Sequence, residues 1–112
     1  MKSDAVYLHH ILDAIGQVED YTTGLSRESF LSDRMVQDAV VRQLEIIGEA
    51  ARRISAERRK ADLALPWKEM IGLRNRIVHD YLNINLQVIW EVIRLELPLL
   101  RAQIEAVLAG LE

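Results

Sequence analysis

The sequence predicts an all-α protein, a four-to-five-helix up-and-down antiparallel bundle with a kink in its last helix. Apolar residues recur at spacings of three and four in several long stretches, which is the pattern of a buried helix face. No stretch makes a convincing β-strand, and the connections are short, so consecutive helices are expected to be antiparallel neighbours. At 112 residues the chain suits a single domain over positions 1–112.

The first helix is predicted from residue 3 to about residue 20. Ser3 is a good N-cap, and Asp4 suits the first turn of a helix. The apolar stripe consists of Leu8, Ile11, Leu12, Ile15 and Val18. His9 and His10 are adjacent, so their side chains point about 100° apart and make a poor metal pair. We therefore expect both histidines to be surface or boundary residues, and Tyr7 to be a packing residue.

A turn around Gly24 leads to a second, long helix that begins after Ser26 or Ser32 and ends near Ser55. Its apolar stripe consists of Val36, Val40, Leu44, Ile47, Ala51 and Ile54. Gly48 interrupts this helix and costs about 1 kcal/mol relative to alanine. A close approach of another backbone would explain a glycine at this position.

A polar and basic connection is expected at residues 57–65, and Pro66 then opens a third helix at its first position. The inner face of this helix consists of Trp67, Met70, Ile71 and Ile77. Because Asp80 is a plausible helix-ending residue, the third helix should end near His79.

The last helix is predicted to begin after a loop at residues 82–86, with Asn83 or Asn85 as its cap, and to run to about Leu108. Its apolar stripe consists of Val88, Ile89, Val92, Leu95 and Leu99. Pro98 cannot donate a backbone hydrogen bond, so a kink is expected there.

The composition excludes several classes of protein. Half the residues are hydrophobic and 28% are charged, which is unlike a disordered chain or a membrane protein. No run approaches the roughly 20 apolar residues of a membrane span, and the N-terminus lacks the apolar core of a signal peptide. The absence of cysteine removes disulfides and thiol chemistry, so a cytoplasmic location is expected. No motif for a metal or cofactor is present.

The net charge of −3 hides a division along the chain. Residues 51–76 carry eight Lys or Arg and three Asp or Glu, a balance of +5, whereas the remaining residues balance at −8. Local charge decides attraction to a phosphate backbone, so the basic segment favours nucleic-acid binding. A solvated, charged helix face and loop would account for the same residues.

The stretch from Arg74 to Tyr81 reads RNRIVHDY and concentrates reactive side chains. An imidazole can move protons near neutral pH, and a guanidinium can bind a phosphate through its planar fork. Arg74 and His79 are therefore candidates for cutting RNA without a metal. Five residues along a helix place them about 140° apart, so the helix must end or deform, or two subunits must share the site. Alternatively, His79 only caps the C-terminus of a helix.

The order Arg, four residues, His, one residue, Tyr resembles the signature of HepT-type toxins, which belong to the HEPN superfamily of small helical ribonucleases. Residues 43–55 (QLEIIGEAARRIS), 66–81 (PWKEMIGLRNRIVHDY) and 88–100 resemble the same family. The resemblance implies a HEPN-like bundle that acts as the toxin of a toxin–antitoxin pair. Arg74 and His79 would be its ribonuclease residues, and an MntA-type nucleotidyltransferase antitoxin would attach AMP to Tyr81. A homodimer is expected, as in similar HEPN ribonucleases.

Neighbouring residues receive supporting roles. Asn75 would hydrogen-bond the RNA substrate or orient a neighbour, and Arg76 would steer RNA. Glu49 would pair with Arg53 four residues later, or would hold Arg74.

Tyr81 has two interpretations. A nearby Arg74 would stabilise some phenolate and make Tyr81 a better nucleotide acceptor. Otherwise Tyr81 is a packed aromatic residue at a helix end. The alternative function is a non-catalytic helical subunit that docks a small nucleotidyltransferase.

Overall fold

The computed structural model describes residues 3–112, and they form an all-helical bundle, as predicted. The elements are α1 (Asp4–Thr22), α2 (Arg27–Leu31), α3 (Arg34–Arg53), α4 (Ala56–Ala61), α5 (Trp67–His79), the 3₁₀ turn η1 (Tyr81–Asn83), α6 (Leu86–Glu91), the π-helical segment η2 (Val92–Glu96) and α7 (Leu97–Leu111). No helix within residues 3–112 is both long enough and apolar enough to cross a lipid bilayer.

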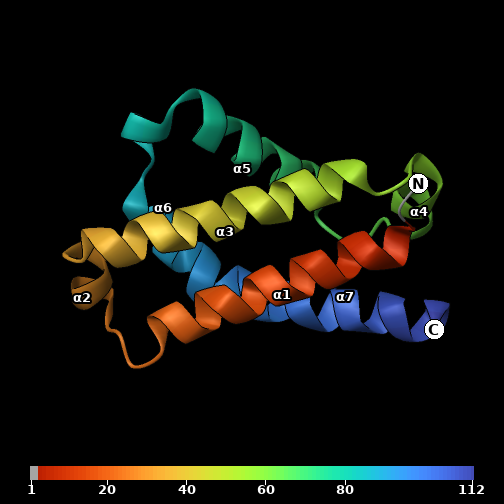
Figure 1. Cartoon of the computed structure of the whole chain (residues 1–112), viewed down its shortest axis with the longest axis horizontal. Helices are drawn as coiled ribbons and strands as arrows, with labels where there is room; N and C mark the ends of the chain where they lie inside the picture. Colours follow the sequence, from red (N-terminus) through yellow and green to blue (C-terminus); the bar gives the residue numbers. More distant parts are fainter. Residues whose placement is uncertain (1–2) are drawn as a thin grey trace.

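The long helices run alternately up and down, and α3 lies between α1 and α5 (Figure 1). α6, η2 and α7 form one continuous helical segment, which lies behind α1 and α3 and covers the remaining side of the core. α3 packs along its length against both α1 and α5, and α7 packs against α1. α5 is therefore an outer helix, and its main neighbour is α3.

The apolar stripes predicted for the first three helices contribute most of their residues to the core. The stripe predicted for the last helix was wrong in part: Val88, Leu95 and Leu99 are exposed, and the buried face, which includes Ile93, Leu97 and Leu100, is displaced by about one residue. Adjacent apolar residues allowed either face there.

Most of the largest fully buried side chains come from α1, α2, α3, α6 and α7, and they include Leu8, Ile11, Ile15, Phe30, Val40, Ile89 and Ile104. Phe30 of α2 stacks on Trp90 of α6, with ring centroids 5.4 Å apart. This contact anchors the short α2 across one end of the bundle.

The predicted long helix after Gly24 is divided into two. Ser26 caps α2, where its side chain accepts a hydrogen bond from the Ser29 amide. Asp33, rather than Ser32, caps α3, because its carboxylate accepts from the amide of Val36 at 3.1 Å. The expected helix start was thus misplaced, since two caps occur within one polar stretch.

The connection expected at residues 57–65 contains a short helix. The side chain of Ser55 accepts a hydrogen bond from the Arg58 amide and begins α4. The same hydroxyl donates to the carboxylate of Asp4 at 2.7 Å, which ties the start of α4 to the start of α1. Ser3 occupies the N-cap position of α1 but makes no capping hydrogen bond with its side chain, contrary to our expectation.

Pro98 affects the last helix through the turn that precedes it. Asn85 caps α6, as predicted, by accepting from the amides of Gln87 and Val88. The chain then widens into the π-helical segment η2, where the amide of Leu97 bonds to the carbonyl of Val92. The irregularity predicted at Pro98 thus takes the form of a wide turn immediately before it.

Candidate functional site

Gly48 sets the distance between α3 and α5. A Cβ atom at this position would lie 2.2 Å from the Cβ of Arg74 and 2.6 Å from the carbonyl oxygen of Met70. Real Cβ atoms do not approach other atoms so closely, so only glycine allows this contact. The close approach expected from the sequence is confirmed, and its partner is the backbone that carries Arg74.

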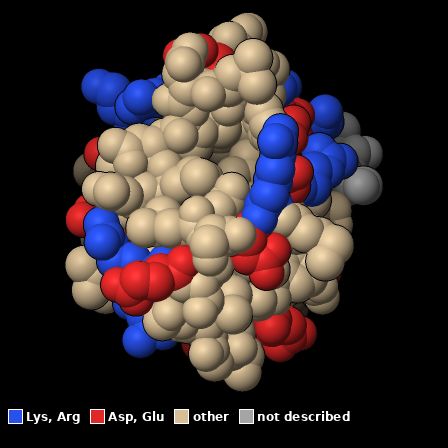
Figure 2. Space-filling view, turned by 90° about the vertical axis from the view of Figure 1, so that its left-hand side faces the viewer, with Lys and Arg blue, Asp and Glu red and all other residues tan. Residues whose placement is uncertain are grey.

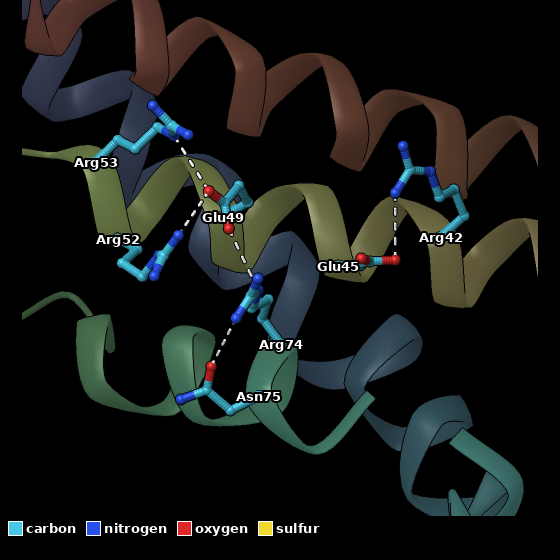
Figure 3. Close-up of polar contacts among 7 residues, drawn as sticks. All are labelled: Arg42, Glu45, Glu49, Arg52, Arg53, Arg74 and Asn75. Atoms are coloured by element: carbon cyan, nitrogen blue, oxygen red, sulfur yellow. Dashed lines mark hydrogen bonds and ion pairs between the residues drawn. The ribbon is translucent and has the colours of Figure 1, made fainter. Parts of the chain in front are cut away.

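Arg74 is held against α3 by two neighbours. Its Nε lies 3.2 Å from Oε2 of Glu49, so the two side chains form an ion pair. Both atoms are buried, and their relative orientation does not allow a hydrogen bond between them. Its Nη1 donates to Oδ1 of Asn75 at 3.0 Å. The Arg74 side chain retains 20% of its exposure. The structure therefore confirms the expected contact with Glu49 and adds a hydrogen bond from Arg74 to Asn75 (Figure 3).

Glu49 is the centre of a guanidinium cluster. Its Oε1 accepts from Arg52 at 3.0 Å and from Arg53 at 3.1 Å, which confirms the predicted pairing with Arg53. The hydrogen bond from Arg52, followed by the contributions of Arg53 and Arg74, holds the pKa of Glu49 below its usual value, although burial opposes this effect. Three guanidiniums around one carboxylate leave the cluster with an excess of two positive charges.

A polar cavity of about 490 Å³ adjoins this cluster. It is lined by Tyr7, His10, Arg42, Glu45, Ile46, Glu49, Ala50, Arg53 and Arg74, which come from α1, α3 and α5. Tyr7 and His10 were expected to be ordinary packing and surface residues, yet both line the cavity that Arg74 borders. Their separation of three residues, which places them on one helix face, was the available signal.

His79 lies apart from Arg74. α5 is regular up to His79 and ends there, with Asp80 leaving the helix at φ −146° and ψ 47°. The side chains of Arg74 and His79 therefore point about 140° apart. Arg74 faces α3, whereas His79 is exposed at the helix end. The helix ends where predicted but without deforming, so one chain does not bring the two residues together.

Tyr81 contacts α3 rather than Arg74. Its hydroxyl donates to Oδ1 of Asp38 at 2.6 Å, and the residue is 45% exposed. This hydrogen bond, together with burial, raises the pKa of Tyr81, while the positive charge of Arg34 opposes the rise. The expectation that Arg74 would favour the phenolate is therefore wrong, because a carboxylate faces the hydroxyl.

The remaining basic residues lie on other sides of α5. Arg76 is exposed and lines a separate cavity of about 260 Å³ together with Asp80. Arg59, Lys60 and Lys68 line a cavity of about 750 Å³ that reaches Asn75. Part of the basic segment therefore gathers near the site. Among the described residues, no group of three or more His, Cys, Asp or Glu could hold a metal ion.

Comparison with known proteins identifies relatives along nearly the whole chain. A family model described as Ribonuclease HepT-like matches residues 11–107. A relative from Caldanaerobacter subterraneus subsp. tengcongensis, whose name describes it as a putative RNase, is 39% identical over 96% of each chain. A protein from Thermococcus cleftensis named as a probable ribonuclease HepT is 35% identical over 93% of this chain and 94% of its own. No solved structure matches significantly.

Proposed function

Because the chain belongs to the HepT-like ribonuclease family, we propose that it is a metal-independent endoribonuclease and the toxin of a toxin–antitoxin pair. Arg74 binds the scissile phosphate, and His79 acts as general acid or base. The observation that carries the proposal is the fixed position of Arg74 between Gly48, Glu49 and Asn75. A guanidinium held in advance can stabilise charge on a phosphate without having to reorganise.

The proposed reaction needs only groups of the RNA and of the protein. The 2′-hydroxyl oxygen forms a bond to phosphorus and loses its proton, and the bond to the 5′-oxygen breaks. The departing oxygen takes up a proton, so the products are a 2′,3′-cyclic phosphate and a 5′-hydroxyl. His79 handles one of these proton transfers, and Arg74 stabilises the charge on the phosphorus centre.

We place the working site between two copies of the chain, because Arg74 and His79 point in different directions within one copy. The outer side of α5 supports this arrangement, since only Trp67, Met70 and Ile77 of the helix are buried. Val78 and Leu82 are exposed by 43% and 89% beside His79. Figure 2 shows that this end of the molecule has a largely uncharged centre, with charged residues mainly around it. A two-fold dimer would cover such a surface and bring His79 of the partner subunit towards Arg74.

Tyr81 is the proposed site of regulation. A nucleotidyltransferase antitoxin would transfer AMP to its half-exposed hydroxyl. The new phosphodiester would remove the proton donated to Asp38 and place a negative charge next to that carboxylate. Tyr81 meets α3 at Asp38 and Arg74 meets it at Glu49, about 16 Å apart along the helix. The inhibitory effect is therefore assigned to repulsion of RNA along this face rather than to occupation of the Arg74 site.

The second candidate function is a non-catalytic subunit that docks a nucleotidyltransferase. The observation in its favour is the separation of Arg74 and His79 within one chain. The His79→Ala variant distinguishes the two functions. It should keep binding to the partner enzyme in either case, but inhibition of cell growth should vanish only if the chain is a nuclease.

The direct test is cleavage of single-stranded RNA in the presence of EDTA. The wild type should release fragments that end in a 2′,3′-cyclic phosphate, and both Arg74→Ala and His79→Ala should abolish the release. Correctly folded wild-type protein that cleaves no RNA, or that cleaves only with an added divalent cation, would contradict the proposal.

A further inference from the structure

The cavity between α1, α3 and α5 has three guanidiniums in its wall. Arg42 and Arg53 lie eleven residues apart on α3, which corresponds to about 16 Å, and Arg74 enters from α5 beside Glu49. One small anion cannot contact cations spread over this length. A chain with repeated phosphates can, so the spacing of the guanidiniums favours a polyanion as the occupant.

The opposite wall of the cavity is aromatic. Tyr7 and His10 of α1 form an edge-to-face pair, with ring centroids 5.9 Å apart. Tyr7 lies near Arg53 and raises the pKa of that guanidinium, after the larger contribution of Glu49. The aromatic wall is therefore tied to the guanidinium wall. Aromatic faces bind unstacked bases, which occur in single-stranded RNA rather than in a duplex.

Two carboxylates complete the lining and reduce its positive charge. Glu45 pairs with Arg42 at 3.2 Å, and Glu49 pairs with Arg53 and Arg74. Carboxylates accept hydrogen bonds from the exposed N–H groups of bases, so they suit a nucleotide better than they suit phosphate alone. With three guanidiniums and two carboxylates, the lining balances at +1.

From the residues that line this cavity we propose that it is a subsite for one nucleotide of a single-stranded RNA, next to the phosphate bound by Arg74. His10 and Tyr7 contact its base, and Arg42 and Arg53 contact the flanking phosphates. This inference rests on the proposed ribonuclease function and adds His10, Tyr7 and Arg42 to its substrate contacts. A volume of about 490 Å³ lies within the range of small-molecule sites.

The test compares two adjacent histidines of α1. His10→Ala removes a wall of the cavity, whereas His9→Ala removes an exposed residue whose Nε2 lies 3.2 Å from Glu112. Affinity is measured with a fluorescein-labelled single-stranded RNA of about ten nucleotides, in a His79→Ala background that prevents cleavage. His10→Ala should weaken binding by about fivefold to one hundredfold, and His9→Ala should leave it unchanged.

A second pair of variants tests the guanidinium wall. Arg42→Gln should reduce the dependence of the logarithm of affinity on the logarithm of salt concentration by about 0.7. Arg27→Gln, on exposed α2, should not change this dependence. With His79 intact, the His10→Ala enzyme should show a raised KM and a nearly unchanged kcat, because the lost contact binds substrate without taking part in the reaction.

The outcomes separate the subsite from the ribonuclease function. If the wild type cleaves RNA while His10→Ala and Arg42→Gln behave like their controls, the subsite is wrong and the ribonuclease stands. A reduced kcat with unchanged KM in His10→Ala would also overturn the subsite, since it would indicate a catalytic role. Wild-type protein that neither binds nor cleaves RNA would overturn both proposals.

Discussion

Gly48 and Arg74 meet at a distance that excludes any side chain on the glycine. The 2.2 Å between a hypothetical Cβ of residue 48 and the Cβ of Arg74 ties the spacing of α3 and α5 to the position of the guanidinium. A change at Gly48 therefore tests packing and activity together.

Gly48→Ala should destabilise the fold by about 1–3 kcal/mol, because α5 must move away from α3 to admit the methyl group. RNA cleavage should fall as Arg74 moves with α5. Gly72→Ala is the matched control on α5, since a Cβ there has no neighbour within 4 Å. It should stabilise the helix by about 0.5–1 kcal/mol. Urea denaturation of both variants measures the two effects, and equal stability of the two would contradict this packing account.

The guanidinium cluster predicts a dependence of stability on pH. The folded-state pKa of Glu49 is below its ordinary value of 4.5, so its ion pairs contribute stability above that pH and lose it as the pH falls through the folded value. Glu49→Gln should therefore lower the free energy of unfolding at about pH 7 by about 1 kcal/mol or less, and much less at about pH 3. Glu105→Gln, an exposed residue of α7, is the control. If the difference in free energy of unfolding between wild type and Glu49→Gln grew as the pH fell, the result would contradict this account of the ion pairs.

The hydrogen bond between Tyr81 and Asp38 predicts a shifted phenol titration. The pKa of Tyr81 is raised above 10.0, so its tyrosinate absorbance should appear at higher pH than that of an exposed tyrosine. Asp38→Asn should shift this titration to lower pH, because the negative charge that opposes ionisation is lost. Tyr81→Phe identifies its component of the titration, and Asp13→Asn serves as the control. Superimposable titrations of wild type and Asp38→Asn would show that the hydrogen bond does not form in solution.

Modification of Tyr81 predicts a change in mass. After incubation with ATP and a nucleotidyltransferase antitoxin, the intact chain should gain one or more AMP units, and Tyr81→Phe should gain none. Tyr21→Phe, on α1, should be modified like the wild type. If the partner enzyme is active on another substrate but leaves the wild-type chain unchanged, Tyr81 is structural and neutralisation would have to occur through binding.

The sequence predicted those parts of the fold that depend on local periodicity. The predicted stripes of α1 and α3 are buried or half-buried, and Gly24 has the positive φ of 77° that a glycine turn allows. The stripe predicted for the last helix was wrong at Leu99, which is exposed, whereas the adjacent Leu100 is buried. Apolar residues adjoin one another there, so the periodicity allowed two faces one residue apart. Helix boundaries were predicted wrongly in polar stretches, where more than one residue can cap a helix. Asp33 competes with Ser32 as a cap, and the polar α4 has no apolar stripe to reveal it.

The contacts of the candidate site could be predicted where the two residues are close in sequence, or where a glycine within a helix indicated a closely packed neighbour. Glu49 and Arg53 form a pair with a separation of four, and Gly48 required a close backbone. The contact of Tyr81 with Asp38 spans 43 residues, so no local pattern indicated it. The cavity was also hidden, because three helices contribute to it and the sequence does not specify how they are rotated about their axes.

The most direct test of the central claim is complementation between two inactive variants. Arg74→Ala and His79→Ala are purified separately, mixed, partly unfolded to exchange subunits, and refolded. If Arg74 of one chain works with His79 of its partner, a mixed dimer contains one intact site, and about a quarter of wild-type cleavage should return. If both residues of one chain form the site, every site in the mixture carries a defect. Absence of recovered cleavage, with mixed dimers demonstrated by mass, would contradict a site shared between two subunits.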